Sequence, residues 1–537
     1  MTFFSRLTSF FTLSKPLRLC ILSGIMFGTS YIPFPPWALF FSLCPLWTVL
    51  LKESSLKKIF FYSWLTPFVF TIIGFHWIPH TIMEFGHMPA FAGAIGLIAF
   101  ASFTNLHFPL AAVVWYRLNQ KLSFSQGKSI FVLALLTALF EKLNPQIFPW
   151  YFGYSWFYGD FPAYQLADTI GVTGLSSLTL IINGWILYIY LNIKDRPVFK
   201  KQVTYFVLFF AIINAIGLYK QHVWEKTDTE IKALMVQPNI GNQEKQWEIF
   251  GPEFKSKTVQ KHFDLTTPEL VNKPDLIIWP ETSIPEFMEP RFYRVKAVKS
   301  VLNYVKSNQI NLFTGAFTED SKTRRQSNAI FTFDTTGKNT GVYQKHILLA
   351  FGEYLPFSDH FPFLLKLLPT IADFERGVGP HVLSITKPQT SEEVQLGPQI
   401  CYEGLHPWFS KGLVDDGADI FVNITNDSWF GHTFESYQHL YMTLMRSVEF
   451  RRPMIRVTNT GISSVILASG KVIEISPQKQ EWAKTVVVPY LKNAPKTIYS
   501  RFLYLDYFAV ILALIYLLKL YKLKPYKLKR WSKKENE

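Results

Sequence analysis

The chain has 537 residues, of which 49% are hydrophobic, and its formal net charge is +15. The positive charge is concentrated in residues 1–219 and 501–537, whereas residues 220–500 carry nearly equal numbers of basic and acidic side chains. The uneven distribution of positive charge therefore indicates membrane topology and gives no support to nucleic-acid binding. There is no zinc-type spacing of cysteine and histidine, no Walker-type phosphate loop and no GxGxxG before a helix. We expect no cofactor and no metal.

Residues 1–219 form a series of apolar runs rich in Phe, Leu, Ile and Trp. Most of them approach the ~20 residues that a helix needs to cross a bilayer. A signal peptide would instead have one short apolar core followed by a cleavage site. The sequence therefore predicts an integral membrane protein. The candidate spans are 17–32, 37–51, 59–78, 90–116, 130–149, 164–192, 202–219 and, near the C-terminus, 502–520.

Lysine and arginine recur in every second loop between these spans, and the positive-inside rule places such loops in the cytoplasm. Seven spans that start inside leave residue 220 outside, and the eighth returns the basic tail to the cytoplasm. We expect a seven-span domain over 1–219, an extracytoplasmic domain over 220–500, and a transmembrane helix with a cytoplasmic tail over 501–537. The basic loops carry Arg6, Lys15 and Arg18; Lys52, Lys57 and Lys58; Arg117, Lys121 and Lys128; and Lys194, Arg196, Lys200 and Lys201.

Residues 220–500 alternate between short apolar runs with strand character and longer helical stretches. In one stretch Val298, Val301, Leu302 and Val305 recur at the spacing of an amphipathic helix. Such alternation predicts an α/β domain, in its more specific form a layered α-β-β-α sandwich. The expected strands cover 231–237, 275–279, 312–317, 329–334, 394–400, 419–425, 454–458 and 462–468, and the expected helices cover 252–271, 290–308 and 434–452.

Cys401 is the only cysteine between the last N-terminal span and the C-terminal one. It follows an apolar strand pattern and precedes a turn, which would present its thiol at the end of a strand. A lone thiol has no disulfide partner within its domain. A buried core cysteine is the ordinary alternative. A Cys–His dyad with His406, five residues further on, is another.

Three ionisable groups stand in comparable positions. Glu281 follows an apolar strand and a proline, so it would lie partly desolvated at the sheet rim, where a general base is useful. Lys345 precedes an apolar patch and could stabilise an oxyanion or a thiolate. Glu353 lies eight residues beyond it. A solvated loop glutamate and a surface lysine are the competing interpretations. A thiol, a base and a cation together would suit acyl transfer through cysteine.

These motifs resemble the Glu–Lys–Cys signature of the nitrilase, or carbon-nitrogen hydrolase, superfamily. They are Trp279-Pro280-Glu281, Lys345 ahead of Phe351-Gly352-Glu353, and Ile400-Cys401-Tyr402-Glu403. Further motifs and the eight-span layout resemble the apolipoprotein N-acyltransferase family, the membrane-embedded branch of that superfamily. Those motifs are Asn423-Ile424-Thr425-Asn426-Asp427-Ser428-Trp429-Phe430-Gly431, Gln438-His439, Arg446-Ser447-Val448-Glu449 and Arg456-Val457-Thr458-Asn459-Thr460-Gly461.

The resemblance implies a two-step acyl transfer in a bacterial inner membrane, with a periplasmic catalytic domain and cytoplasmic termini. A phospholipid, in the first place phosphatidylethanolamine, would donate an acyl chain to Cys401 as a thioester. The free α-amine of an S-diacylglyceryl-cysteine at the N-terminus of an apolipoprotein would then accept it. Glu281 would be the base, Lys345 the oxyanion stabiliser and Glu353 a supporting carboxylate. The resemblance also assigns supporting or pocket roles to Tyr402, Glu403, Trp247 and Arg376, and it implies a monomer among membrane lipids.

Some positions depart from the family pattern. These are Ala350, Pro238, Gly241 and Gly404, and they put loop conformation and pocket shape in question. Two other functions remain open on the residues alone. One is a membrane-tethered amidohydrolase of the nitrilase type, which would pass its acyl group to water. The other is a polytopic receptor or transporter whose outer domain binds a ligand with a degenerate site.

Overall fold

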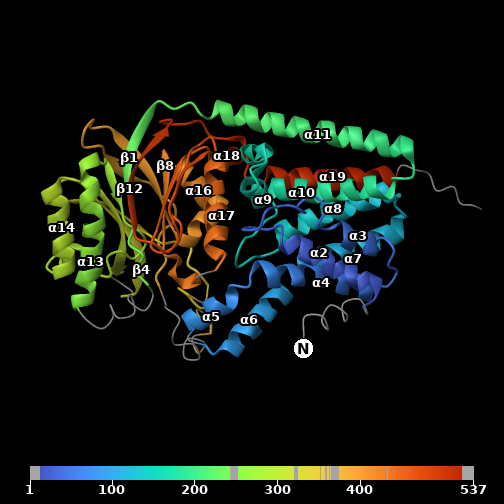
Figure 1. The fold of residues 1–537 in the computed structure, drawn as a ribbon, viewed down its shortest axis with the longest axis horizontal. Coiled ribbons are helices and arrows are strands. Elements are labelled where there is room, and N and C mark those ends of the chain that lie inside the picture. Colours follow the sequence, from blue (N-terminus) through green and yellow to red (C-terminus); the bar gives the residue numbers. More distant parts are fainter. Residues whose placement is uncertain are drawn as a thin grey trace, which may run out of the picture.

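A computed structural model of the chain shows a bundle of helices beside a domain built on two β-sheets (Figure 1). The sheets lie at one end of the molecule, and the long helices extend away from them. The structure describes residues 13–86, 88–241, 252–319, 324–350, 352–356, 358, 360–361, 363, 374–431 and 433–522.

The helical region combines long apolar helices with short ones. Within the described residues, four helical segments are long and apolar enough to cross a membrane, namely Leu56–Gly74, Ala90–Leu122, Pro162–Leu191 and Arg196–Val223. The helices are α2 (Lys15–Gly28), α3 (Cys44–Leu50), α4 (Leu56–Gly74), α5 (Ile78–Gly86), α6 (Ala90–Phe103), α7 (His107–Leu122), α8 (Gln126–Leu143), α9 (Tyr154–Tyr158), α10 (Ala167–Leu191), α11 (Arg196–Val223) and, after the sheet domain, α19 (Leu505–Lys522).

The exposed surface of α11 is strongly apolar. Val207, Leu208 and Ile212 are all more than half exposed. A protein surrounded by water rarely leaves a continuous apolar face uncovered, so this face suits contact with lipid. The four spanning segments match the expected spans 59–78, 90–116, 164–192 and 202–219. The other four expected spans, 17–32, 37–51, 130–149 and 502–520, are not among the segments that qualify within the described residues. The run 37–51 forms only the seven-residue helix α3, and the run 90–116 is divided between α6 and α7.

The two sheets have six strands each. Their orders are β12-β1-β2-β3-β4-β5 and β11-β10-β9-β8-β7-β6. β1 to β3 run parallel in the first sheet and β7 to β9 run parallel in the second. The strands are β1 (Thr229–Gln237), β2 (Leu276–Ile278), β3 (Leu312–Glu319), β4 (Gln326–Phe333), β5 (Asn339–Gln344), β6 (Leu383–Thr386), β7 (Glu393–Ile400), β8 (Ile420–Thr425), β9 (Met454–Thr458), β10 (Ser464–Ile466), β11 (Val472–Ile475) and β12 (Trp482–Tyr490).

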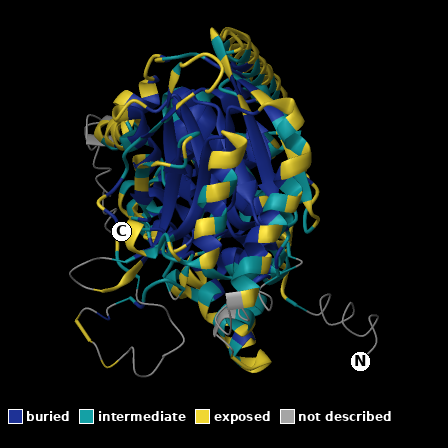
Figure 2. Cartoon of the chain, turned by 90° about the vertical axis from the view of Figure 1, so that its left-hand side faces the viewer, coloured by how far each residue is buried: buried dark blue, intermediate teal, exposed yellow. Residues whose placement is uncertain are grey.

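Helices cover the outer face of each sheet. α13 (Pro252–Thr266) and α14 (Lys296–Asn308) pack on the first sheet, where Val298, Val301 and Val305 of α14 join the buried core. The amphipathic spacing therefore predicted this helix correctly. α16 (Pro407–Asp415) and α17 (Glu435–Phe450) cover the second sheet. The strands of the sheets are mostly buried, whereas the exposed residues lie mainly on the outer helices and loops (Figure 2).

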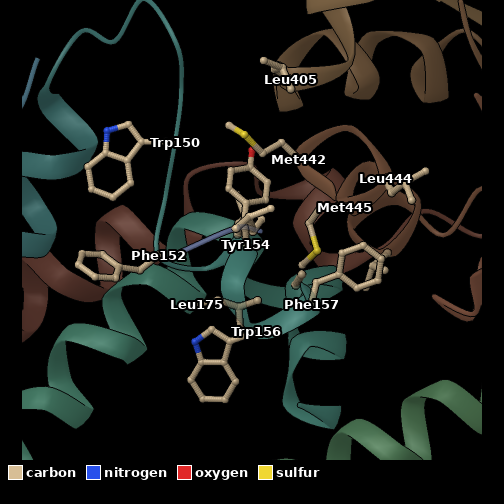
Figure 3. Packing of buried hydrophobic residues seen from close by; sticks show 14 of the residues in the cluster. Trp150, Phe152, Tyr154, Trp156, Phe157, Leu175, Leu405, Met442, Leu444 and Met445 are labelled. Atoms are coloured by element: carbon tan, nitrogen blue, oxygen red, sulfur yellow. The ribbon is translucent and has the colours of Figure 1, made fainter. Parts of the chain in front are cut away.

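α17 also joins the sheet domain to the helical region. Its Met442 and Met445 lie in one buried cluster with Tyr154 and Phe157 of α9 (Figure 3). Leu175 of α10 belongs to the same cluster. Because this apolar core is continuous across the boundary, the two parts pack as one body, and the sheet domain has a fixed orientation on the helices.

Candidate active site

Glu281 lies just beyond the carboxyl end of β2, close to the neighbouring strand β3. A side chain at Gly315 of β3 could not be accommodated, because a Cβ there would stand 2.7 Å from the Cα of Glu281 and 2.6 Å from the carbonyl oxygen of Pro280. Glycine at this position therefore lets the chain after β2 turn closely over β3. Glu281 is only 6% exposed. The solvated-loop interpretation of Glu281 is therefore wrong.

Lys345 follows β5 and is buried between two carboxylates. Its Nζ lies 2.7 Å from Oε1 of Glu353 and 3.6 Å from Oε1 of Glu281. Burial alone would lower the pKa of Lys345, but the two glutamates outweigh it and the net shift is upward. The ammonium therefore stays charged, and the surface-lysine interpretation does not hold.

Asn328 of β4 links the two glutamates and was not singled out from the sequence. Its Nδ2 donates to Oε1 of Glu281 at 2.6 Å and lies 3.5 Å from Oε1 of Glu353. Its backbone carbonyl accepts from the amide of Lys345 at 2.9 Å. Glu281 also accepts from the backbone amide of Asn426 at 2.8 Å. A buried amide within an apolar strand was the available signal, since buried polar groups need partners.

Cys401 stands at a strained turn between β7 and the short helix η4 (Cys401–Leu405), with a φ of +51°. Non-glycine residues adopt this conformation rarely, and it is often found at functional sites. Burial raises the pKa of the Cys401 thiol, and Glu281 raises it further, while Lys345 and a hydrogen bond with Thr425 lower it. The net shift is upward, so the resting group is a thiol whose proton must be removed as it reacts.

Gly404, a departure from the family pattern, is explained by the space around it. A Cβ at this position would stand 2.6 Å from Cγ2 of Thr443 and 3.2 Å from Nδ2 of Asn423. The short helix η4 thus packs directly on α17 and β8. Gly241 differs, because no atom of the described residues lies within 4 Å of where its Cβ would be.

Glu403 is buried and forms hydrogen bonds with both of the loops that carry Cys401 and Lys345. Its Oε1 accepts from the hydroxyl of Tyr343 at 2.6 Å and from the backbone amides of His346 and Ile347 at 2.7 and 3.1 Å. Its Oε2 accepts from the amide of Ile400 at 2.8 Å. The carboxylate is fully buried, so its contacts in this structure are the ones that hold the two loops together.

A second polar network lies behind Cys401. His439 Nδ1 lies 2.9 Å from Oδ1 of Asp427, and Arg456 Nη2 lies 3.1 Å from its Oδ2. Asp427, His439 and Glu435 are close enough together to share a metal ion. The guanidinium of Arg456 already supplies a positive charge to Asp427, however, which fits a metal ion poorly.

The turn at Cys401 is also connected to the helical region. Arg446 Nη1 donates to the carbonyl oxygen of Leu405 at 2.8 Å, and Arg446 Nε lies 2.7 Å from Oε2 of Glu449. Oε1 of Glu449 accepts from the amide of Val172 at 2.8 Å. That amide is available because α10 is broken at Gly171, where φ is +68°. Glu449 thus caps a membrane helix while its partner Arg446 supports the helix that begins at Cys401.

A cavity of about 370 Å³ lies next to these groups, between the loop after α8 and the loop after β5. Tyr402 and Arg376 line it, together with Tyr354 and His406. The Tyr402 hydroxyl donates to the carbonyl oxygen of Ile147 in the helical region. The Tyr402 ring also lies against His406, at 4.7 Å between centroids. Trp247 lies outside the described residues.

Sequence comparisons give the same division of the chain. Residues 23–185 match the apolipoprotein N-acyltransferase N-terminal domain, and residues 235–493 match the carbon-nitrogen hydrolase family. An apolipoprotein N-acyltransferase of Bdellovibrio bacteriovorus is 44% identical over 508 residues, which cover 93% of this chain and 92% of the relative. The chain belongs to the apolipoprotein N-acyltransferase family. A relative of the same name from Geobacter metallireducens is 29% identical, over 86% of this chain and 87% of its own.

The solved structures to which the chain is similar include an amidase from Nesterenkonia sp. and Nit3 of Saccharomyces cerevisiae. The amidase is 15% identical, covers 48% of this chain and 90% of its own, and has a TM-score of 0.35. Nit3 is 15% identical, covers 49% of this chain and 91% of its own, and has a TM-score of 0.36.

Proposed function

We propose that the protein transfers an acyl chain from a phospholipid to the α-amine of a diacylglyceryl-modified apolipoprotein. The observation that carries this proposal is the strained Cys401 turn, with Glu281 and Lys345 both acting on its thiol, in a chain similar over nearly its whole length to apolipoprotein N-acyltransferases. Cys401 is the proposed nucleophile, Glu281 the base and Lys345 the oxyanion stabiliser.

In the first step Glu281 takes the thiol proton as the sulfur attacks the ester carbon of the phospholipid. The carbonyl oxygen becomes an oxyanion, which the buried ammonium of Lys345 stabilises. The ester C–O bond then breaks, and the lysophospholipid oxygen takes the proton back from Glu281. Glu353 and Asn328 hold Lys345 and Glu281 in place throughout.

In the second step the acceptor amine attacks the thioester. Glu281 takes a proton from the amine, the C–S bond breaks, and Cys401 leaves as a thiolate that the proton on Glu281 restores to a thiol. A thioester keeps the acyl group activated, so the reaction needs no external energy source. The cavity beside Tyr402 and Arg376 is a suitable entrance for both lipids, because it borders the helical region.

The proposed layout has eight membrane spans in a bacterial inner membrane, arranged in the three parts 1–219, 220–500 and 501–537. Both termini face the cytoplasm and the sheet domain, an α-β-β-α sandwich, faces the periplasm. The apolar exposed faces of the helices and the alternating basic loops support this orientation. We propose phosphatidylethanolamine as the donor and a monomer as the active form.

The test is an acyl-transfer assay with purified protein, phosphatidylethanolamine and a synthetic peptide that begins with S-diacylglyceryl-cysteine. We expect an N-acylated peptide and lysophosphatidylethanolamine in equal amounts. The same peptide with an acetylated N-terminus is the matched control and should not be acylated. Release of free fatty acid without an amide product would instead indicate an amidohydrolase-like enzyme and overturn the proposal.

A further inference from the structure

A large cavity lies at the end of the helical region that is distant from the sheet domain. It has a volume of about 1040 Å³ and lies between the start of α2, helix α3 and the last turn of α10. The opposite end of α10 holds the sheet domain, where Asp168 pairs with Arg451. Pockets that hold drug-sized molecules measure about 300–1,000 Å³, so this cavity is at the upper end of that range.

The walls of the cavity are apolar. Leu19, Phe41, Val49, Ile186 and Leu191 line it. Helix α3, which has only seven residues and contacts both α2 and α10, supplies part of the wall. Within a membrane protein such an apolar recess suits a hydrocarbon chain better than water, since water would find few polar partners there.

The rim of the cavity is basic. Lys15, Lys52 and Lys194 line it and come from three separate segments of the chain. All three are exposed, and none of them forms an ion pair with an acidic group in the described part of the chain. The one carboxylate at the rim, Glu53, is directed to the backbone, because its Oε1 accepts from the amides of Ser54 and Ser55 at 3.0 and 2.9 Å.

We propose that this cavity binds an anionic phospholipid of the cytoplasmic leaflet. One acyl chain would occupy the apolar recess and the phosphate would lie among the three lysines. Basic pockets between membrane helices on the cytoplasmic side are known to hold acidic headgroups. The leaflet follows from the proposed topology, whereas binding itself does not depend on acyl transfer. The site is separate from the catalytic cavity, which lies next to the sheet domain.

The test is native mass spectrometry of the full-length protein released from phosphatidylcholine nanodiscs that contain a minority of phosphatidylglycerol. The measured quantity is the fraction of protein that retains one phosphatidylglycerol. We expect the triple variant Lys15→Gln, Lys52→Gln and Lys194→Gln to weaken retention by about tenfold or more. Because all three side chains are exposed, the variant should fold normally, and thermal unfolding checks this.

The matched control removes three other lysines that the same basic loops carry, through Lys57→Gln, Lys58→Gln and Lys200→Gln. These residues do not line the cavity, and the control protein has the same net charge as the cavity variant. The catalytic cavity is intact in both proteins, so lipid bound there contributes equally. We expect the control to retain phosphatidylglycerol as the unmodified protein does. Equal loss in both variants, or equal retention, would overturn the proposal.

A second variant leaves the charges in place and fills the recess. Thr48 lines the cavity and is half-buried, so Thr48→Trp should block the acyl chain. We expect this variant also to lose retained phosphatidylglycerol. Unchanged retention would show that the lysines hold a headgroup at the surface, with no chain in the recess, and would overturn the proposed binding mode.

Discussion

Neutralising Glu281 should make Cys401 react faster with a small alkylating agent and should abolish acyl transfer through the same thiol. In Glu281→Gln the carboxylate charge that raises the pKa of the Cys401 thiol is gone, while Lys345 still lowers it. We therefore expect the pKa of the thiol to fall, so that Cys401 reacts faster with a small alkylating agent. Acyl transfer should nevertheless be lost, because the thiol and the acceptor amine no longer have a base.

The expected change in alkylation rate follows from the pKa shift that the charge of Glu281 causes. A charge within about 4–6 Å changes a pKa by about 1–3. At a pH below both pKa values the thiolate fraction would rise accordingly by about 10- to 1000-fold. A thiolate of lower pKa is intrinsically less nucleophilic, with a Brønsted coefficient of about 0.4–0.5. The net gain in alkylation rate is therefore roughly 3- to 60-fold, whereas loss of a general base should slow acyl transfer by about 10²–10⁴.

The assay measures the rate of iodoacetamide incorporation at Cys401 across a series of pH values, by peptide mass spectrometry. The profile of Glu281→Gln should lie at lower pH than that of the unmodified protein. Lys345→Met should show the opposite displacement, because the cation that lowers the pKa of the thiol is removed. The matched control is Glu474→Gln, which removes the charge of a carboxylate that pairs with Lys484. Slower alkylation in Glu281→Gln would refute this account of the charges around Cys401.

Three further outcomes follow from the structure. Thr425→Val removes the hydroxyl that lowers the pKa of the Cys401 thiol, so alkylation should require higher pH, and Thr425→Ser should restore the profile; identical profiles would contradict the assignment. Gly404→Ala should lower the free energy of unfolding by about 1–3 kcal/mol through its clash with Thr443, and adding Thr443→Ser should recover most of the loss in thermal unfolding. Arg446→Met should cost about 3–5 kcal/mol in the same measurement, because Glu449 is left buried without its cation; a loss below about 1 kcal/mol, typical of an exposed pair, would contradict it.

The sequence predicted the elements whose pattern is strong. The buried parallel strands around Leu276, Ile400 and Met454 are apolar runs in the sequence, and the apolar residues of α14 recur at the spacing of an amphipathic helix. β6 and β12 were not predicted, because they are partly exposed and mix polar with apolar residues. The helix α16 was not among the expected helices, although Pro407 occupies its first helical position, where proline is common.

The candidate site was partly predictable. Strand ends marked Glu281 and Cys401 as candidates, and the apolar patch that follows it marked Lys345. The sequence could not show that Glu403 connects two loops, because its hydrogen-bond partners Tyr343 and His346 are about 60 residues away along the chain. Such contacts depend on how the two sheets pack, and local patterns carry no information about that packing.

The most direct test of the central claim is the intact mass of the purified protein after incubation with phosphatidylethanolamine and no acceptor. We predict an added mass equal to one acyl chain, located on Cys401 and removed by hydroxylamine, as expected for a thioester. The adduct should disappear when the diacylglyceryl peptide is added, and Cys401→Ala should show none. Normal acylation of the peptide by Cys401→Ala would contradict the account.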